Sequence, residues 1–224
     1  FDKDGNLQKK YKFSGKILNA SINITKDYSF QNLTTEVNYE KNSGIDKLNA
    51  IVKNGSLYNI NLADSKLDII KNENQTKVKS ILYTNGIMNY NQIKNIYKLF
   101  GLKLDFLKDI DLNVNLETKI NFDLNQKYKI KNLVYSSEGN IKSLELNTTN
   151  NNNIKKYLPN YNDKIYLKNT KIEFKKSKTK QIVLLEGLIK SDSNYDNFKL
   201  SQEYINKEKS HKVKGEIELK NSEV

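Results

Sequence analysis

The amino-acid sequence predicts a mainly β protein, built as a long antiparallel meander sheet with one or two short amphipathic helices. Three observations favour this fold class. Apolar and polar residues alternate over long stretches, the alternation changes to a helical period in one short segment, and polar turn residues recur about every ten residues. Regularly spaced strands joined by polar turns are typical of antiparallel sheets with few helices.

The clearest alternation runs from Asp111 to Asn125. Side chains of a strand point alternately to its two faces, so this segment predicts one strand with an apolar and a polar face. At about 3.3 Å per residue it would span roughly 45 Å, which is long for a strand. The residues predicted on the apolar face are Leu112, Val114, Leu116, Thr118, Ile120, Phe122 and Leu124.

Shorter alternating segments fill the N-terminal part of the chain. The first covers 11–25 and places Leu18, Ala20, Ile22 and Ile24 on one face; the others are 33–39, 48–52, 58–62 with Ile60 and Leu62, 67–69 and 78–82. Asn42-Ser43-Gly44 has the composition of a turn. The dipeptide Asn54-Gly55 lies between two alternating runs and predicts a hairpin.

The period changes between Asn89 and Gly101. Ile93, Ile96, Tyr97 and Phe100 stand at the spacing of one helix face, which predicts a short amphipathic helix near 89–100. Asn89 or Asn91 is suited to cap its start and Gly101 its end. An apolar bridge at 102–107 leads into the long strand, and 154–158 predicts a single helical turn that ends at Pro159.

The C-terminal half continues the meander. Residues 182–189 are apolar on both faces, which predicts a strand that is central or covered on both sides. Polar or charged turns are expected at 175–180, 191–194 and 207–210, and a loop at 150–153. The remaining strands are expected around 128–135, 141–146, 165–167, 172–174, 198–204 and 213–219.

No compositional boundary divides the chain. We therefore expect residues 1–224 to form a single β-rich segment of a larger elongated protein. The chain begins with Phe1, and no stretch has the composition of a signal peptide or a spanning helix. An export signal or membrane anchor is expected to lie outside this sequence.

The charge and composition narrow the function classes. Every basic residue is Lys, and the formal net charge is +12. This charge favours attraction to an anionic surface such as lipid headgroups. The abundance of Lys, Asn, Ile and Tyr is equally what an AT-rich genome encodes. Hydrophobic residues make up 37%, which is low for a globular domain, where about 45–50% is usual.

Catalytic and metal-binding signals are weak. The chain has no Cys, and its one histidine, His211, lies in a Lys-rich stretch that reads as a solvated turn. No nucleophile elbow or phosphate-binding loop is present. We therefore expect no enzyme activity, no metal site and no cofactor. Because Arg is absent and Lys is spread along the chain, we also expect no nucleic-acid partner.

An antiparallel sheet with one apolar face has to cover that face. It can close on itself as a sandwich or barrel, or it can curl into an open groove that another molecule fills. Periodicity does not separate these alternatives. A closed sandwich or a β-solenoid would suit a structural or adhesion domain of a surface protein, although a solenoid should show a fixed repeat period and none is found.

The long alternating strands, the short helix between strand sets and the passage YLPNYND…IYLKNTKIEF, within 157–174, resemble the AsmA-like family of bacterial bridge-like lipid transfer proteins. The resemblance covers most of the chain. It implies a sheet curled into an open, taco-like groove that carries phospholipid acyl chains. It also implies a periplasmic protein, anchored to the inner membrane through a region outside this sequence, that moves phospholipid toward the outer membrane and supports envelope integrity.

The residues expected to line the groove follow from this resemblance. They would contact phospholipid acyl chains, the expected partner, and membrane contact would come from regions outside the segment. The sequence predicts no oligomeric state. The expected lining residues are Leu18, Ile22, Ile24, Ile60, Leu62, Leu112, Val114, Leu116, Ile120, Phe122 and Leu124.

Overall fold

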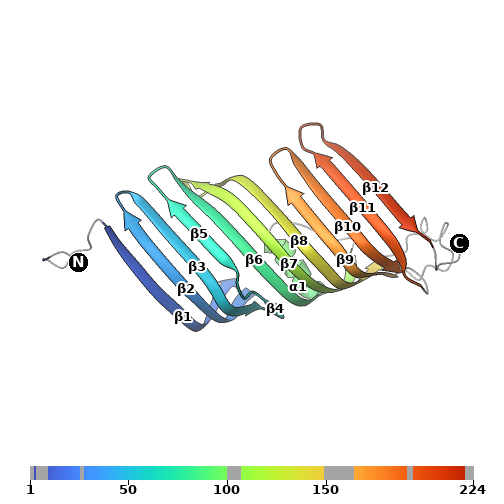
Figure 1. The fold of residues 1–224 in the computed structure, drawn as a ribbon, viewed down its shortest axis with the longest axis horizontal. Helices are drawn as coiled ribbons and strands as arrows, with labels where there is room; N and C mark the ends of the chain where they lie inside the picture. The colour runs from blue at the N-terminus through green and yellow to red at the C-terminus, as the bar shows by residue number, and fades with distance from the viewer. Residues whose placement is uncertain are drawn as a thin grey trace.

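A computed structural model describes residues 3, 10–25, 28–99, 107–148, 164–190 and 194–219. Within this part of the chain the protein is mainly β, with twelve strands in one sheet and one helix, α1. The predicted fold class is thereby confirmed as a long antiparallel meander. Figure 1 shows the strands following one another across the sheet in chain order, with α1 behind the sheet in this view.

The strands are longer than most predicted segments. β7 and β8 have 19 residues each, and at about 3.3 Å per residue each would span roughly 60 Å. The elements are β1 Lys10–Thr25, β2 Tyr28–Asn42, β3 Ile45–Leu57, β4 Ile60–Asn61, β5 Lys66–Lys71, β6 Gln75–Asn89, α1 Tyr90–Leu99, β7 Leu107–Asn125, β8 Ile130–Thr148, β9 Lys164–Lys176, β10 Lys180–Lys190, β11 Asp196–Ile205 and β12 Ser210–Glu218.

The sheet is a single layer. Every strand is antiparallel to its neighbours, and the extensive contacts of each strand are with the strands it pairs with. α1 contacts β6 and β7. Among the described strands, β1 and β12 form the two edges of the sheet. In the described ranges no second sheet packs on the first, so the sandwich alternative is not what these strands form.

One position of the sheet is shared by two short strands. Both β4 and β5 lie between β3 and β6, so pairing runs in a ring through these four strands. Between β4 and β5 the chain at 62–65 keeps backbone hydrogen bonds to β3 but leaves the ladder with β6. Ser65 fills the gap: its hydroxyl accepts a hydrogen bond from N of Tyr83 at 3.0 Å and donates one to the Tyr83 carbonyl at 3.4 Å. Its side chain therefore takes the place of the missing ladder bonds.

Cross-strand partners place their side chains on the same side of a sheet, so the register defines two faces. We call the side that carries Val114 the apolar face and the side that carries Asn115 the polar face. The register connects Val114 through Gly86 to Ile60 in one direction and through Ile141 to Thr170 in the other. The predicted alternation of β7 is confirmed, because its even-numbered residues from Leu112 to Leu124 lie on the apolar face.

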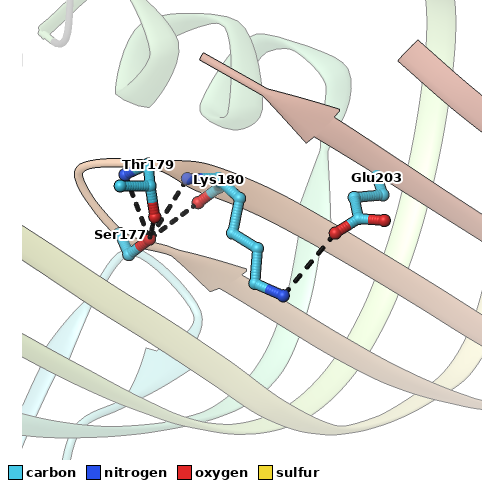
Figure 2. A network of polar contacts seen from close by, with 4 residues as sticks. All are labelled: Ser177, Thr179, Lys180 and Glu203. Atoms are coloured by element: carbon cyan, nitrogen blue, oxygen red, sulfur yellow. Dashed lines mark hydrogen bonds and ion pairs between the residues drawn. The ribbon is translucent and has the colours of Figure 1, made fainter. Parts of the chain in front are cut away.

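The hairpin turns lie largely where turn chemistry predicts them. Ser43 and Gly44 have φ values of 42° and 84° and join β2 to β3. The charged turn at 175–180 is also confirmed: the Ser177 hydroxyl accepts hydrogen bonds from N of Thr179 and N of Lys180 (Figure 2). Beside this turn, Lys180 forms an ion pair of 3.5 Å with Glu203, which ties β10 to β11 (Figure 2).

The predicted hairpin at Asn54-Gly55 is wrong. This dipeptide lies inside β3, and the similar pair Asn85-Gly86 lies inside β6. A hairpin turn of type I′ needs left-handed helical φ values at both central residues. Gly55 and Gly86 instead have φ values of 158° and 156°, a region open to glycine that keeps the strand extended but changes its direction locally.

Asparagine residues occupy several of the β-bulges at which the strand pairing is irregular. Four asparagines have φ between 48° and 55°, and each is one of two residues that oppose a single residue of the neighbouring strand. This is the arrangement of a β-bulge with a left-handed residue, which is the second of the pair at Asn19 and the first at the other three. Asn tolerates that conformation better than other non-glycine residues. The four are Asn19, Asn32, Asn132 and Asn169.

The predicted helix is confirmed as α1. Asn89 caps it: its Oδ1 accepts from N of Gln92 at 3.1 Å, and Gln92 Oε1 accepts from N of Asn89 at 3.0 Å. This reciprocal pair is a capping box. Ile93 of the helix is buried. The predicted cap at Gly101, the bridge over 102–106, the loop at 150–153 and the helical turn at 154–158 lie outside the described residues.

Candidate functional site

A line of glycines crosses the middle of the sheet. We call Gly55, Gly86, Gly139 and Gly187 the glycine belt. Neighbouring backbone approaches three of these residues closely, because a Cβ on Gly86 would overlap the Asn59 carbonyl, one on Gly139 the Asn115 carbonyl, and one on Gly187 would lie 2.6 Å from Cα of Thr170. Glycine inside a strand marks such bends and close approaches. At three positions of the belt, a side chain in place of glycine would therefore collide with the neighbouring strand.

The most deeply buried side chains lie along this belt. Thr170 is 0% exposed and Val114 is 1% exposed, and both are on the apolar face. A flat sheet without a second layer would leave the side chains on both of its faces partly in contact with water. Neighbouring side chains and backbone on the apolar face therefore cover Val114 and Thr170 at the belt.

Apolar residues on both sides of the belt join one cluster. Its buried members are Ile60, Leu62, Val114 and Ile141, from β4, the 62–65 segment, β7 and β8. Half-buried side chains from β2, β3 and β6–β10 pack against them. These neighbours are Phe30, Val52, Leu57, Met88, Leu112, Leu116, Leu144, Ile172 and Leu185.

The apolar face becomes more exposed toward the edges of the sheet. On β1, Phe13 is 60% exposed, and on β12, Val213 is 62% exposed. Ile17 and Ile217 are exposed as well. Exposed contiguous apolar surface on a protein marks an interaction site for protein, membrane or ligand. The apolar face is the candidate functional site of this chain.

The structure brings most of the predicted lining residues together. The six on β7 share the apolar face, Ile60 joins them through Gly86, and Leu62 packs on Ile60 and Val114. Ile22 also lies on this face, because its partner Phe30 pairs with Leu57 and Leu57 with Ile60. The predicted residues on the apolar face are Ile22, Ile60, Leu62, Leu112, Val114, Leu116, Ile120, Phe122 and Leu124.

Leu18 does not join the other predicted lining residues. Leu18 is 67% exposed and lies in the bulge with Asn19, so the alternation assumed over 18–24 is interrupted there. Ile17 and Ala20, which flank the bulge, are the residues that pair with Thr35 and Leu33. The side chain of Ile24 lies outside the described residues.

Sequence reasoning missed the contribution of the other strands. Thr170 and Phe198 are buried on the apolar face, although neither is among the predicted lining residues. The signal that points to them is the register, since Thr170 pairs with Ile141 and Phe198 pairs with Gly187. Glycines inside alternating segments were a second signal that a sequence alone offers.

Hydroxyl groups on the apolar face differ in whether they have a hydrogen-bond partner. Thr118 and Ser137 hydrogen-bond each other at 2.9 Å. Thr35, which is 6% exposed, has a buried Oγ1 with no hydrogen-bond partner. Toward one end of the strands, burial together with the Tyr11 hydroxyl and the Asp46 carboxylate raises the pKa of Tyr39 to about 12. Tyr39 is therefore neutral at physiological pH.

The polar face carries the ion pairs of the sheet. Glu117 contacts Lys119 at 2.6 Å, and Lys119 also lies 3.8 Å from Glu138 on β8. The Lys119 ammonium, helped by the Tyr83 hydroxyl, lowers the pKa of Glu117. A hollow of about 620 Å³ on this face, over β8–β12, is ringed by Lys and Glu together, so it favours neither anions nor cations.

Other chemistry has little support. Within the described ranges no three His, Cys, Asp or Glu side chains come together as a metal site would need. His211 lies at the start of β12 rather than in a turn. It is exposed, as predicted, and its ring centroid lies 4.4 Å from that of Tyr204 with the two planes tilted by 32°. Among the same residues, no helix has the length and apolarity to cross a membrane.

Comparison with known proteins identifies no family for this chain. No protein-family model, no curated protein and no solved structure matches this chain.

Proposed function

We propose that the apolar face is an open groove that binds phospholipid acyl chains, and that the chain is a lipid-carrying segment of the AsmA-like type. One observation carries the proposal: a single-layer sheet buries side chains on one face along the glycine belt while leaving that face exposed toward both edges. A face of this kind needs apolar contacts that the described strands do not supply.

The chemistry of the groove suits acyl chains. Its lining is mostly aliphatic, with few polar groups that a ligand would have to match. Each buried CH₂ contributes about 0.8 kcal/mol, so burying ~8 methylenes would contribute about 6 kcal/mol before the entropy cost of binding. Aliphatic side chains repeat from strand to strand, so no one position would hold an acyl chain much more tightly than the next.

The polar face is suited to exposure to water. Lys and Glu alternate on it and pair across strands, as Lys16 does with Glu36 at 3.1 Å and Lys199 with Glu186 at 3.0 Å. A sheet with one ion-paired face and one aliphatic face could carry lipid through an aqueous compartment. The proposed compartment is the periplasm, with the inner-membrane anchor outside this sequence and the outer membrane as destination.

The experiment is lipid co-purification. The protein is purified without detergent, extracted with organic solvent, and the extract is analysed by mass spectrometry. Ile120→Asp places a charge on the apolar face outside the buried cluster, and Asn121→Asp adds the same charge to the polar face of the same strand. Circular dichroism verifies that each variant is folded.

Phospholipid in the parent and in Asn121→Asp, with little in a folded Ile120→Asp, would support the proposal. A folded parent that carries no lipid, and takes up none from vesicles, would overturn it. Equal lipid in all three proteins would mean that lipid binds elsewhere than on the apolar face.

A further inference from the structure

The β12 edge of the sheet has an unusual sequence. β12 pairs with β11 on one side, and among the described residues nothing pairs with its other side. Around Gly215 the sequence reads Lys-Val-Lys-Gly-Glu-Ile-Glu, from Lys212 to Glu218. Reading outward from Gly215, each Lys on one side has a Glu at the same distance on the other, and Val213 is matched by Ile217.

This pattern is self-complementary for antiparallel pairing. If two copies of β12 align with Gly215 opposite Gly215, each position faces the one equally distant on the other side. Lys214 then faces Glu216, Lys212 faces Glu218, and Val213 faces Ile217. Opposite charges and apolar pairs directly across an antiparallel ladder are favourable, and like charges are unfavourable. A parallel pairing in register would place each charge against its own kind.

We propose that β12 is a homodimerisation edge, at which two copies of this chain pair antiparallel about a two-fold axis at Gly215. A C2 interface must be self-complementary, and β12 has that property. The axis is perpendicular to the sheet, so the apolar faces of both copies lie on the same side. The two sheets then continue as one.

The side chains that would face each other are exposed, and Glu218 Oε2 also accepts a hydrogen bond from Asn197 Nδ2 at 3.2 Å. Lys212, Lys214, Glu216 and Glu218 project from the polar face and are exposed. On the apolar face, Val213 and Ile217 are 62% and 56% exposed. Gly215 leaves space at the axis, because a Cβ there would meet its nearest neighbour, Cδ1 of Leu200, at 3.7 Å.

The other edge lacks this property. β1 carries Lys10, Lys12 and Lys16 on its polar face and no acidic residue. Antiparallel pairing of two β1 strands about Ser14 would place Lys12 against Lys16. Lysines along an exposed edge are a common way to prevent strand pairing. The two edges of this sheet therefore differ: the lysines of β1 disfavour pairing with a second copy, whereas β12 is complementary to itself.

A charge-swap experiment tests the pairing. One variant carries Glu216→Lys and Glu218→Lys, and the other carries Lys212→Glu and Lys214→Glu. Sedimentation velocity over a wide range of protein concentration measures self-association, at low salt because exposed ion pairs are screened. A control variant, Lys77→Glu with Lys79→Glu, makes the same change of charge as Lys212→Glu with Lys214→Glu, but on the interior strand β6, where both lysines are exposed.

We expect the parent and the β6 control to form a reversible dimer. Each swapped variant alone should dimerise more than about tenfold more weakly, because like charges then face each other. Mixing the two swapped variants should restore a dimer, since every Lys again faces a Glu. Circular dichroism verifies that both variants keep the sheet.

Three results would overturn the proposal. A parent that is monomeric at all concentrations has no such edge. Swapped variants that dimerise as well as the parent use another surface. Polymers that grow when β12 carries only Glu would indicate head-to-tail pairing of β12 with the Lys-rich β1. None of these results depends on lipid, so the dimer and the lipid groove can fail separately.

Discussion

Gly187 of β10 lies directly against Thr170 of β9, which is fully buried. A Cβ added to Gly187 would stand 2.5 Å from Oγ1 and 2.6 Å from Cα of Thr170. Contacts that short force backbone to move rather than a flexible side-chain end. The two residues lie opposite each other at the bulge that Asn169 begins, so the glycine, the bulge and the buried threonine form one unit of the belt.

Gly187→Ala should therefore lower the free energy of unfolding by about 2 kcal/mol, as overpacking of a tight site does. Gly215→Ala is the matched control, since its Cβ would only reach ordinary contact with Leu200, and it should change stability by less than about 0.5 kcal/mol. Urea unfolding at low protein concentration measures both. Equal stability of the two variants would contradict the close packing at the belt.

The bulge residue gives a second prediction. Asn169 has φ of 48°, where a β-branched side chain is strained. Asn169→Val should destabilise the protein by about 1–2 kcal/mol, whereas Asn169→Gly should be close to neutral. Urea midpoints for the two variants provide the measurement. A Val variant as stable as the Gly variant would show that this residue does not need a left-handed conformation.

Features of the fold that depend on local sequence could be predicted, and those that depend on neighbouring strands could not. The alternation of Leu112 to Leu124 depends on local periodicity, and it predicted β7 and its apolar face correctly. The capping box of Asn89 and Gln92 is equally local. Asn54-Gly55 was mistaken for a turn because the same dipeptide serves a hairpin or a bend in a strand, and only the neighbouring backbone decides which.

The candidate site depends on longer-range information. Thr170 is buried because it pairs with Ile141 and contacts Gly187. Both contacts depend on how β9 is aligned with the neighbouring strands, which the local sequence around Thr170 does not specify. Leu18 was assigned to the lining because alternation was extended through Asn19, where a bulge shifts the register. Whether the sheet closes or stays a single layer depends on contacts between strands far apart in sequence, which periodicity does not encode.

The buried hydroxyl of Thr35, which has no hydrogen-bond partner, gives a third prediction. A buried polar atom without a partner costs about 1–3 kcal/mol, and replacing it with an apolar group of the same shape removes that cost. Thr35→Val should therefore raise the free energy of unfolding by about 1 kcal/mol. Thr170→Val, which loses a hydrogen bond to the Lys168 carbonyl, should lower it instead. The opposite order in thermal or urea unfolding would contradict this assignment.

Acid should weaken the ion pairs of the polar face. Hydrogen bonds from Lys16 and then Lys53, at 3.1 and 3.2 Å, lower the pKa of Glu36 below its usual value. A carboxyl whose pKa is lower in the folded state stabilises the fold above its unfolded pKa, and this contribution is lost as pH falls through the folded pKa. The effect should be modest because the pair is exposed.

Glu36→Gln tests this dependence. The difference in urea midpoint between the parent and Glu36→Gln should be largest at neutral pH and low salt, and it should vanish in acid below the folded pKa. Glu73→Gln, in the exposed turn before β6, serves as the control for removing one acidic charge. A midpoint difference that stayed constant down to strong acid would show that the Glu36 ion pairs do not contribute.

The final prediction concerns which face meets lipid. Because the chain has no Cys, a single cysteine can be placed at position 122 or 121 and labelled with a polarity-sensitive fluorophore. Phe122 lies on the apolar face opposite Val78, and Asn121 lies on the polar face opposite Lys79. Phospholipid vesicles should shift the emission of the label at 122 to shorter wavelength, because acyl chains displace water there. The label at 121 should report little change. Equal shifts at both positions would indicate adsorption of the whole sheet to the vesicle surface, and a shift at 121 alone would place the lipid on the ion-paired face, contrary to the proposed groove.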